Sequence, residues 1–364
     1  MSAIGVASIA CGLAGVAALV GLACFTPSCG SFGTAETPAD GGTGEPSKAR
    51  DLTIALELPS VAALDPYSGT RVAAVAVVVT DAADASRTKR VDVASADRGP
   101  FTIAGFVSTP LVHATVEVRD ASGRLVGYGA RRAAEVGTGA PVQVAVRKRL
   151  VYFTSRDRGD AGQLRVFDLG AAEVAEGGLA ELVAAPLQTL SEPRGLYATA
   201  DGRHLVEAAE VSPGSGALAV FDSGTHARKS VIPLPFVPGT LVPVEDGTRA
   251  VVAPEEATGD TVFALVDVVK GELRLIPSGV QGGTLRAGEG AASPDGARVA
   301  VVGDHWASSS SNPKAFLFVL AFEPGRHDPV ASALDLSPHV ESARGVRFSP
   351  DGARIYVSGR SGDS

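Results

Sequence analysis

The chain has 364 residues, of which 45% are hydrophobic, 20% are charged and only 5% are aromatic, and its formal net charge is −8. This length gives room for two domains and a leader, and 43 glycines and 23 prolines favour short strands joined by turns over long helices. The two basic clusters are short, "RTKR" from Arg87 and "RKR" from Arg147. Nucleic acid is excluded as a partner because it requires a basic stripe that displaces counterions.

The N-terminus begins with an uncharged apolar run over residues 4–25, and no Lys or Arg precedes Lys48. Such a run suits an export signal or a membrane-spanning segment. All three cysteines lie here, at Cys11, Cys24 and Cys29. We therefore expect no disulfide framework and no zinc site in the folded part of the chain.

The tetrapeptide "GLAC" that ends at Cys24 resembles a bacterial lipobox, with Gly21 where leucine is usual. The resemblance implies a leader over residues 1–24, lipidation of Cys24, and export to the periplasm, the outer membrane or the cell surface. Simple cleavage and an uncleaved anchor are the alternatives. Residues 25–50 are rich in Gly, Pro, Thr and Ser, which predicts a flexible linker.

Residues 51–148 predict a first β domain. "DLTIALELP" from Asp51 and the run from Val116 to Val118 alternate apolar residues at a period of two, and "DASG" from Asp120 marks a hairpin turn. At least five short strands in this length predict a small β-sandwich. It resembles immunoglobulin-like or transthyretin-like accessory modules, without the Cys and Trp signature of true immunoglobulin domains.

The second half of the chain contains a repeated phrase. "SPDGARVAVVGD" from Ser293 and "SPDGARIYVSGR" from Ser349 agree at eight of twelve positions, and looser copies begin at Ala198 and Pro243. The aspartates of the four turns are separated by 45, 49 and 56 residues. A period of this size is typical of propeller blades.

Each repeat reads as four antiparallel strands. A strand follows each Asp-Gly turn, a polar loop leads to a third strand such as "GALAVFDSG" from Gly216, and a fourth such as "KSVIPLP" from Lys229 precedes a Pro/Gly bend such as "EPRG" from Glu192. Glycine suits the turn because it adopts positive φ freely. The segment "YFTSRDRGDAGQLRVFDL" from Tyr152 and the "SPDG" phrases resemble YVTN-type and WD-like Tol-system β-propeller repeats of bacterial envelope proteins.

The predicted fold class is therefore all-β, with the N-terminal β-sandwich followed by a partial or small β-propeller of four to five blades over residues 149–364. The first unit starts at its second strand and the last contains only two strands. We interpret the propeller as truncated at its C-terminus, since closure by strands from both ends would leave one strand in surplus.

The loops opposite the Asp-Gly turns are the predicted functional face, because loops carry function more often than turns fixed by the scaffold. Their carboxylates can hold Ca²⁺, which prefers oxygen ligands, although solvated loop residues are the simpler interpretation. The indole of Trp306 can stack on a sugar ring. The candidate ligand-binding residues are Asp157, Asp160, Glu210, Glu255, Glu256, Asp260, Asp304, His305 and Trp306.

Three functional hypotheses follow. The first is an exported envelope lipoprotein, attached to the membrane by its lipid or its apolar segment, whose propeller binds a protein, peptide or glycan. The second is a metal-dependent hydrolase or lactonase on the acidic face, which rests on analogy of fold because no catalytic set can be assigned. The third is a purely structural spacer.

Overall fold

The computed structural model describes residues 50–68, 72–94, 97–106, 110–136, 139–155, 163–169, 180–181, 189–244, 246–259, 262–307, 312–322 and 328–360. Every element whose bounds it gives is a β-strand. Within these residues no helix has the length and apolar character needed to span a bilayer. The predicted leader and all but the last residue of the predicted linker lie outside the described residues.

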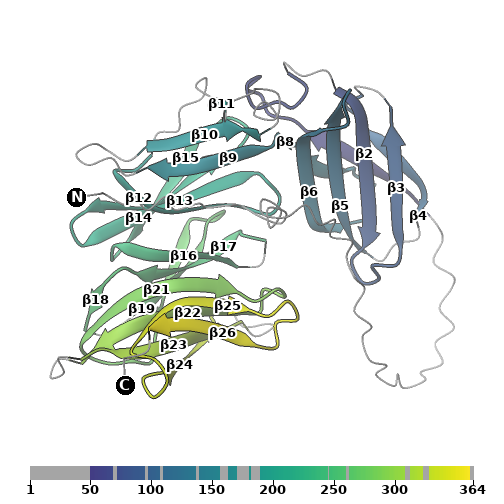
Figure 1. The fold of residues 1–364 in the computed structure, drawn as a ribbon. Coiled ribbons are helices and arrows are strands. Elements are labelled where there is room, and N and C mark those ends of the chain that lie inside the picture. Colours follow the sequence, from purple (N-terminus) through teal and green to yellow (C-terminus); the bar gives the residue numbers. More distant parts are fainter. Residues whose placement is uncertain are drawn as a thin grey trace, which may run out of the picture.

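Two sheets form the N-terminal part of the structure (Figure 1). One has the order β4-β1-β7, with β1 at Arg50–Glu57, β4 at Phe101–Phe106 and β7 at Val142–Ala145. The other has the order β3-β2-β5-β6-β8, with strands at Val72–Asp81 (β2), Thr88–Val93 (β3), Leu111–Asp120 (β5), Leu125–Glu135 (β6) and Arg147–Lys148 (β8).

Alternating side chains of these two sheets meet in one hydrophobic core. Val75, Val77 and Val79 of β2 point into it together with Ile54 of β1 and Val144 of β7, and all five are fully buried. Every second residue of a strand faces the same side, which is why the period-two pattern predicted this packing. Two sheets on one core form the β-sandwich expected from the sequence.

Five further sheets follow in chain order. The first has the order β11-β10-β9 and the second has the order β12-β13-β14-β15. Their strands lie at Leu150–Ser155 (β9), Gln163–Asp168 (β10), Ala180–Glu181 (β11), Glu192–Ala198 (β12), His204–Ser212 (β13), Ser215–Asp222 (β14) and Arg228–Leu234 (β15).

The third sheet, β16-β17-β19-β20, has four antiparallel strands, and the fourth has the same pattern in β21 to β24 with the short strand β18 added beside β21. The fifth holds β25 and β26. The bounds are Pro238–Val244 (β16), Arg249–Pro254 (β17), Ala257–Thr258 (β18), Val262–Asp267 (β19), Glu272–Pro277 (β20), Thr284–Ala292 (β21), Arg298–Trp306 (β22), Lys314–Ala321 (β23), Val330–Asp335 (β24), Ser342–Phe348 (β25) and Ile355–Arg360 (β26).

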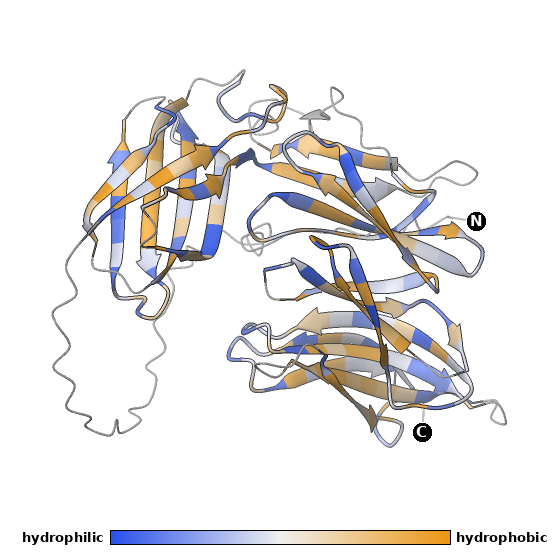
Figure 2. Cartoon of the chain, turned by 180° about the vertical axis from the view of Figure 1, so that it is seen from behind, coloured by the Kyte–Doolittle hydropathy of each residue, from blue (hydrophilic) through white to orange (hydrophobic). Residues whose placement is uncertain are grey.

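Each pair of consecutive sheets encloses its own hydrophobic core. Val252 of β17 packs with Val206 and Leu218 of the preceding sheet, whereas the adjacent Val251 packs with Val301 and Phe318 of the following sheet. Both faces of the sheet are therefore buried by neighbours, and Figure 2 shows the resulting bands of hydrophobic residues along the strands. Face-to-face stacking of four-stranded antiparallel sheets is the architecture of a β-propeller.

The first strands of successive sheets contact one another, β12 with β16, β16 with β21 and β21 with β25, and so form the inner side of the propeller. In Figure 1 the sheets β9–β11 and β25–β26 lie at opposite ends of this arrangement. The described sheets thus form an arc of blades, as expected for a partial propeller.

The repeated Asp-Gly turns are held by the side chain of their aspartate. Asp295 accepts hydrogen bonds from the Ser293 hydroxyl at 2.5 Å and from the Ala297 amide at 3.0 Å, and the last copy has the same two bonds. In the looser copy, Thr248 supplies both the amide and the hydroxyl to Asp246. These local bonds explain why the phrase recurs, and they give it a structural role.

The sandwich and the propeller are joined by a largely buried arginine at the end of the sandwich. Arg147 donates to the Glu57 carbonyl at 2.8 Å and to the Ser223 hydroxyl at 3.1 Å, which lies in the β14–β15 turn. Arg203 reaches the Glu57 carboxylate from the propeller at 2.5 Å. Because these contacts gather at the Asp-Gly turns, the sandwich occupies that side of the second sheet.

Candidate functional site

The predicted site residues that the structure describes lie at one end of the propeller sheets, where the first strands begin and the second strands finish. We call this end, opposite the Asp-Gly turns, the loop face. The strand pairs Glu192 with Glu210, Arg286 with Asp304 and Ser342 with Arg360 all lie at the loop face. The other candidates, Cys24, Asp157, Asp160 and Asp260, lie outside the described residues.

Three of the predicted acids occupy one repeat position. Glu210, Glu255 and Asp304 each follow the aspartate of their turn by nine residues, and Arg360 stands there in the last sheet. The expectation that all were loop residues was wrong for Glu210 and Asp304, which lie within β13 and β22. Strand pairing continues past the predicted ends, so their side chains have fixed directions.

An arginine that the sequence analysis did not select joins two of these acids. Arg194 is the extra residue of a β-bulge in β12, between Pro193 and Gly195. The sequence predicted a bend at "EPRG", whereas these residues belong to the strand itself. A bulge redirects a side chain locally, and the first strands of the next three sheets have irregularities at the corresponding place.

The guanidinium of Arg194 bridges two sheets. Its Nη2 lies 2.5 Å from a carboxylate oxygen of Glu210, and its Nη1 lies 3.0 Å from Oε1 of Glu255 in the next sheet. Glu192 is a third acid, at 3.6 Å. The three carboxylates around one cation form a tie between blades, and the side chain of Arg194 is only 17% exposed.

Asp304 has a comparable role between the fourth and fifth sheets. Its buried carboxylate accepts hydrogen bonds from the Ser342 hydroxyl at 2.7 Å and from the Ala343 amide at 3.2 Å, both in β25. Arg344 lies 3.9 Å away. These contacts use both carboxylate oxygens to hold the next blade.

The neighbouring His305 and Trp306 do not join Asp304 in a common site. His305 is buried, its Nε2–H donates to the Gly282 carbonyl at 2.5 Å, and its ring meets the Phe316 ring edge-on at 5.9 Å. Successive residues of a strand face opposite sides, so His305 points away from the side shared by Asp304 and Trp306. Trp306 is half-buried and ends β22, opposite Thr284.

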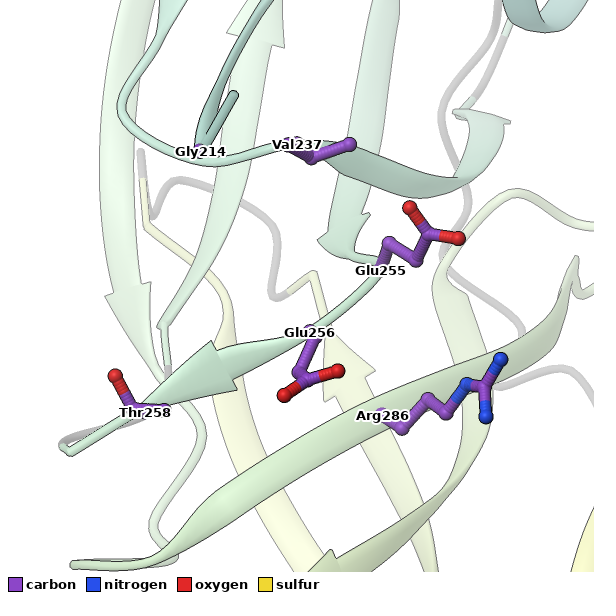
Figure 3. A pocket seen from close by; sticks show the side chains of 6 residues that line it. All are labelled: Gly214, Val237, Glu255, Glu256, Thr258 and Arg286. Carbon is purple, nitrogen blue, oxygen red and sulfur yellow. The ribbon is translucent and has the colours of Figure 1, made fainter.

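A pocket of about 390 Å³ opens at the loop face, lined by residues that come from the second, third and fourth sheets and their connections (Figure 3). It brings Glu255 and Glu256 together with a residue missed in the sequence, Arg286 of β21. Among the described residues, neither Glu256 nor Arg286 has an ion-pair partner within 4.0 Å. The remaining lining residues are Gly214, Val237 and Thr258.

The carboxylates and arginines of the loop face can pair with charged groups of a ligand. The arginines that the sequence did not reveal recur at related positions of the repeats. Arg194 precedes its turn aspartate by seven residues, as Arg344 does in the last repeat, and Arg286 precedes its own by nine. Aligning the repeats would have placed them at the loop face. The described residues contain no group of three or more His, Cys, Asp or Glu side chains arranged to share a metal ion.

A separate buried acid lies on β13 away from the loop face. Glu207 is fully buried, and one of its oxygens accepts the Leu190 amide at 3.2 Å while the other has no hydrogen-bond partner. Burial raises the pKa of this carboxyl to about 7. The Leu190 amide and Arg228 act in the opposite direction, but their effect on the pKa is smaller.

Comparison with known proteins places the chain by its fold alone. No protein-family model matches it, and no curated protein matches it. Similar solved structures include Kuenenia stuttgartiensis hydrazine synthase, at 16% identity over 67% of this chain and 70% of that one, with a TM-score of 0.44. TolB from Acinetobacter baumannii gives 13% identity over 70% and 62%, with a TM-score of 0.39.

The periplasmic gluconolactonase PpgL of Pseudomonas aeruginosa gives 18% identity over 78% of this chain and 88% of that one, with a TM-score of 0.41. At these values the fold assignment rests on the stacked sheets and the cores between them. The resemblance to β-propeller repeat proteins predicted from the sequence is confirmed for the fold. The protein is an all-β protein in which a β-sandwich precedes an arc of β-propeller blades.

Proposed function

We propose that this protein is an exported envelope lipoprotein whose propeller is a non-enzymatic binding platform, with the loop face as its binding surface. The observation that carries the proposal is the pocket at this face, where Glu256 and Arg286 are not neutralised by any described partner. A ligand that supplies the opposite charges would complete both ion pairs. The sandwich contacts the propeller at the other end of the blades, beside the Asp-Gly turns, through Arg147 and Ser223. This contact supports the choice of the loop face as the binding surface.

The contacts of the other acids favour binding over hydrolysis. A carboxylate that activates water or holds a metal needs oxygens available to the reacting group. Arg194 engages Glu210 and Glu255, and Asp304 accepts two hydrogen bonds from the next blade. The proposal therefore requires no Ca²⁺, and the melting temperature should stay unchanged when Ca²⁺ is added; a rise would show instead that the loop face binds this ion.

The binding proposal is tested by probing peptide and glycan arrays with the purified protein and mapping any ligand by hydrogen exchange. We expect protection at Glu255, Glu256 and Arg286. Arg286→Glu should weaken binding, whereas Arg354→Glu, the same change beside an Asp-Gly turn, should not. Protection confined to the Asp-Gly turns would contradict the assignment of the loop face.

The envelope location is proposed from the apolar segment and Cys24. Metabolic labelling with a clickable fatty acid, followed by mass spectrometry of the mature N-terminus, should find acyl chains on Cys24 in the membrane fraction. Cys24→Ala should abolish labelling and release the protein. An unlabelled protein that begins after another residue would exclude the lipid anchor and leave the binding proposal intact.

A further inference from the structure

Charge changes sign along the inner side of the loop face. On the second and third sheets, Arg194 contacts the carboxylates of Glu192, Glu210 and Glu255. Glu256 adds a fourth carboxylate, so negative charge is in excess among these described residues. At the same end of the fourth and fifth sheets the described arginines outnumber the acids. The arginines are Arg286, Arg344 and Arg360, and the acids are Asp304 and Glu341.

The pocket lies where this sign changes. Glu256 follows β17 on the acidic side, and Arg286 lies in β21 on the basic side, with the cavity between them (Figure 3). One oxygen of Glu255 accepts a hydrogen bond from Arg194, so Glu255 already has a cationic partner. The two charged groups of the lining that have no ion-pair partner among the described residues are therefore the Glu256 carboxylate and the Arg286 guanidinium, on facing walls.

From this arrangement we infer that the pocket binds an extended peptide segment of a partner protein that carries one basic and one acidic side chain, in a fixed order along its chain. The inference rests on the proposed function and names the ligand class of that site. The basic side chain pairs with Glu256 and the acidic one with Arg286. Because the two walls carry opposite charges, reversing the peptide direction would bring like charges together, which is unfavourable.

The lining favours a peptide over a sugar. Sugars and other ring ligands commonly stack on aromatic side chains, and the pocket walls offer only Val237 as a sizeable apolar surface. A volume of about 390 Å³ accommodates a few side chains of an extended segment. Gly214, which has no side chain, leaves room for a peptide backbone to approach this part of the lining.

The test uses the full-length protein and pairs of short fluorescent Gly/Ser peptides that contain one Lys and one Glu, in both orders and at several separations. Fluorescence anisotropy should show that the protein prefers one order by at least about fivefold in Kd. Raising the ionic strength should weaken binding, since these charges are exposed. Glu256→Lys and Arg286→Glu should each abolish the preference for order.

The double variant E256K/R286E provides the decisive comparison, because it exchanges the two charges while keeping the net charge. It should prefer the opposite order of Lys and Glu. The matched control is R132E/E135K on β6 of the sandwich, which makes the same exchange elsewhere and should retain the wild-type preference. Circular dichroism and thermal melts establish that each variant is folded.

Equal affinity for both orders, or an unchanged preference in E256K/R286E, would overturn the inference. If ligands found on the arrays nevertheless protect the loop face from hydrogen exchange, the proposed binding platform stands and only the ligand class is wrong. If ligands protect other surfaces, the proposed function itself fails.

Discussion

Nη1 of Arg194 in β12 lies 3.0 Å from Oε1 of Glu255, the residue that directly follows β17 of the next sheet. The bulge in β12 makes this contact possible, because it turns Arg194 out of the ladder toward the loop face. The same guanidinium neutralises Glu210, so removing it would leave acids from two blades facing one another.

We predict that Arg194→Ala lowers the free energy of unfolding by about 2 kcal/mol, since it removes a largely buried cation from between the Glu210 and Glu255 carboxylates. Urea denaturation measures the change. Arg194→Lys keeps the charge but lacks the forked geometry, and should fall between the wild type and the alanine variant. A loss no greater than that of an exposed control such as Arg132→Ala would contradict the role of Arg194 as a tie.

Asp304→Ala should destabilise the attachment of β25 by about 1–3 kcal/mol, because the Ser342 hydroxyl and the Ala343 amide both lose their acceptor. Hydrogen exchange at the Ala343 amide should accelerate. Ser342→Ala removes one of the two bonds and should have a smaller effect. Unchanged exchange at Ala343 would show that the Asp304 contact is not a tie between blades.

Glu207 predicts a characteristic dependence of stability on pH. Burial raises its pKa from 4.5 to about 7, so between these values the folded state holds a proton that the unfolded state has released. Stability must then fall as pH rises through this window, by up to about 3 kcal/mol, and level off above pH 7.

The variant Glu207→Gln isolates this contribution, because glutamine has a similar shape and does not titrate. The difference in unfolding free energy between the variant and the wild type should change little below pH 4.5 and should grow in favour of glutamine up to about pH 7. Denaturant titrations across this range measure it. If the difference in unfolding free energy stayed constant with pH, the pKa of the Glu207 carboxyl would not be raised in the folded state.

Arg147→Met should weaken the coupling of the sandwich to the propeller, since the Arg147 guanidinium donates to both the Glu57 carbonyl and the Ser223 hydroxyl. We expect the single thermal transition of the wild type to separate into two, and protease cleavage near residue 149 to increase. Lys148→Met, one residue along and paired with Asp168 at 3.4 Å, serves as a neighbouring control. A single transition in Arg147→Met would mean that other contacts hold the two parts together.

The strands and their turns could be predicted because their causes are local. Period-two alternation in β1 follows from burial of one face, and the continuous apolar run of β17 follows from burial of both faces. The Ser293 and Asp295 bonds likewise fall within a few residues. The repeat spacing then predicted the propeller. The loop assignment of Asp304 failed because its strand is extended by pairing with β21 and β23, which the local sequence does not specify.

Local patterns of residues were enough to predict an all-β chain of repeated hairpins, with acids recurring at one end of the blades. Which of these acids pair with an arginine and which lie open to a ligand depends on how the blades pack together. Arg194 meets Glu255 across 61 residues of chain, and Glu256 faces Arg286 only because two blades pack side by side. Such contacts depend on the bulge in β12 and on the packing of whole sheets, and neither is encoded within a short stretch of residues.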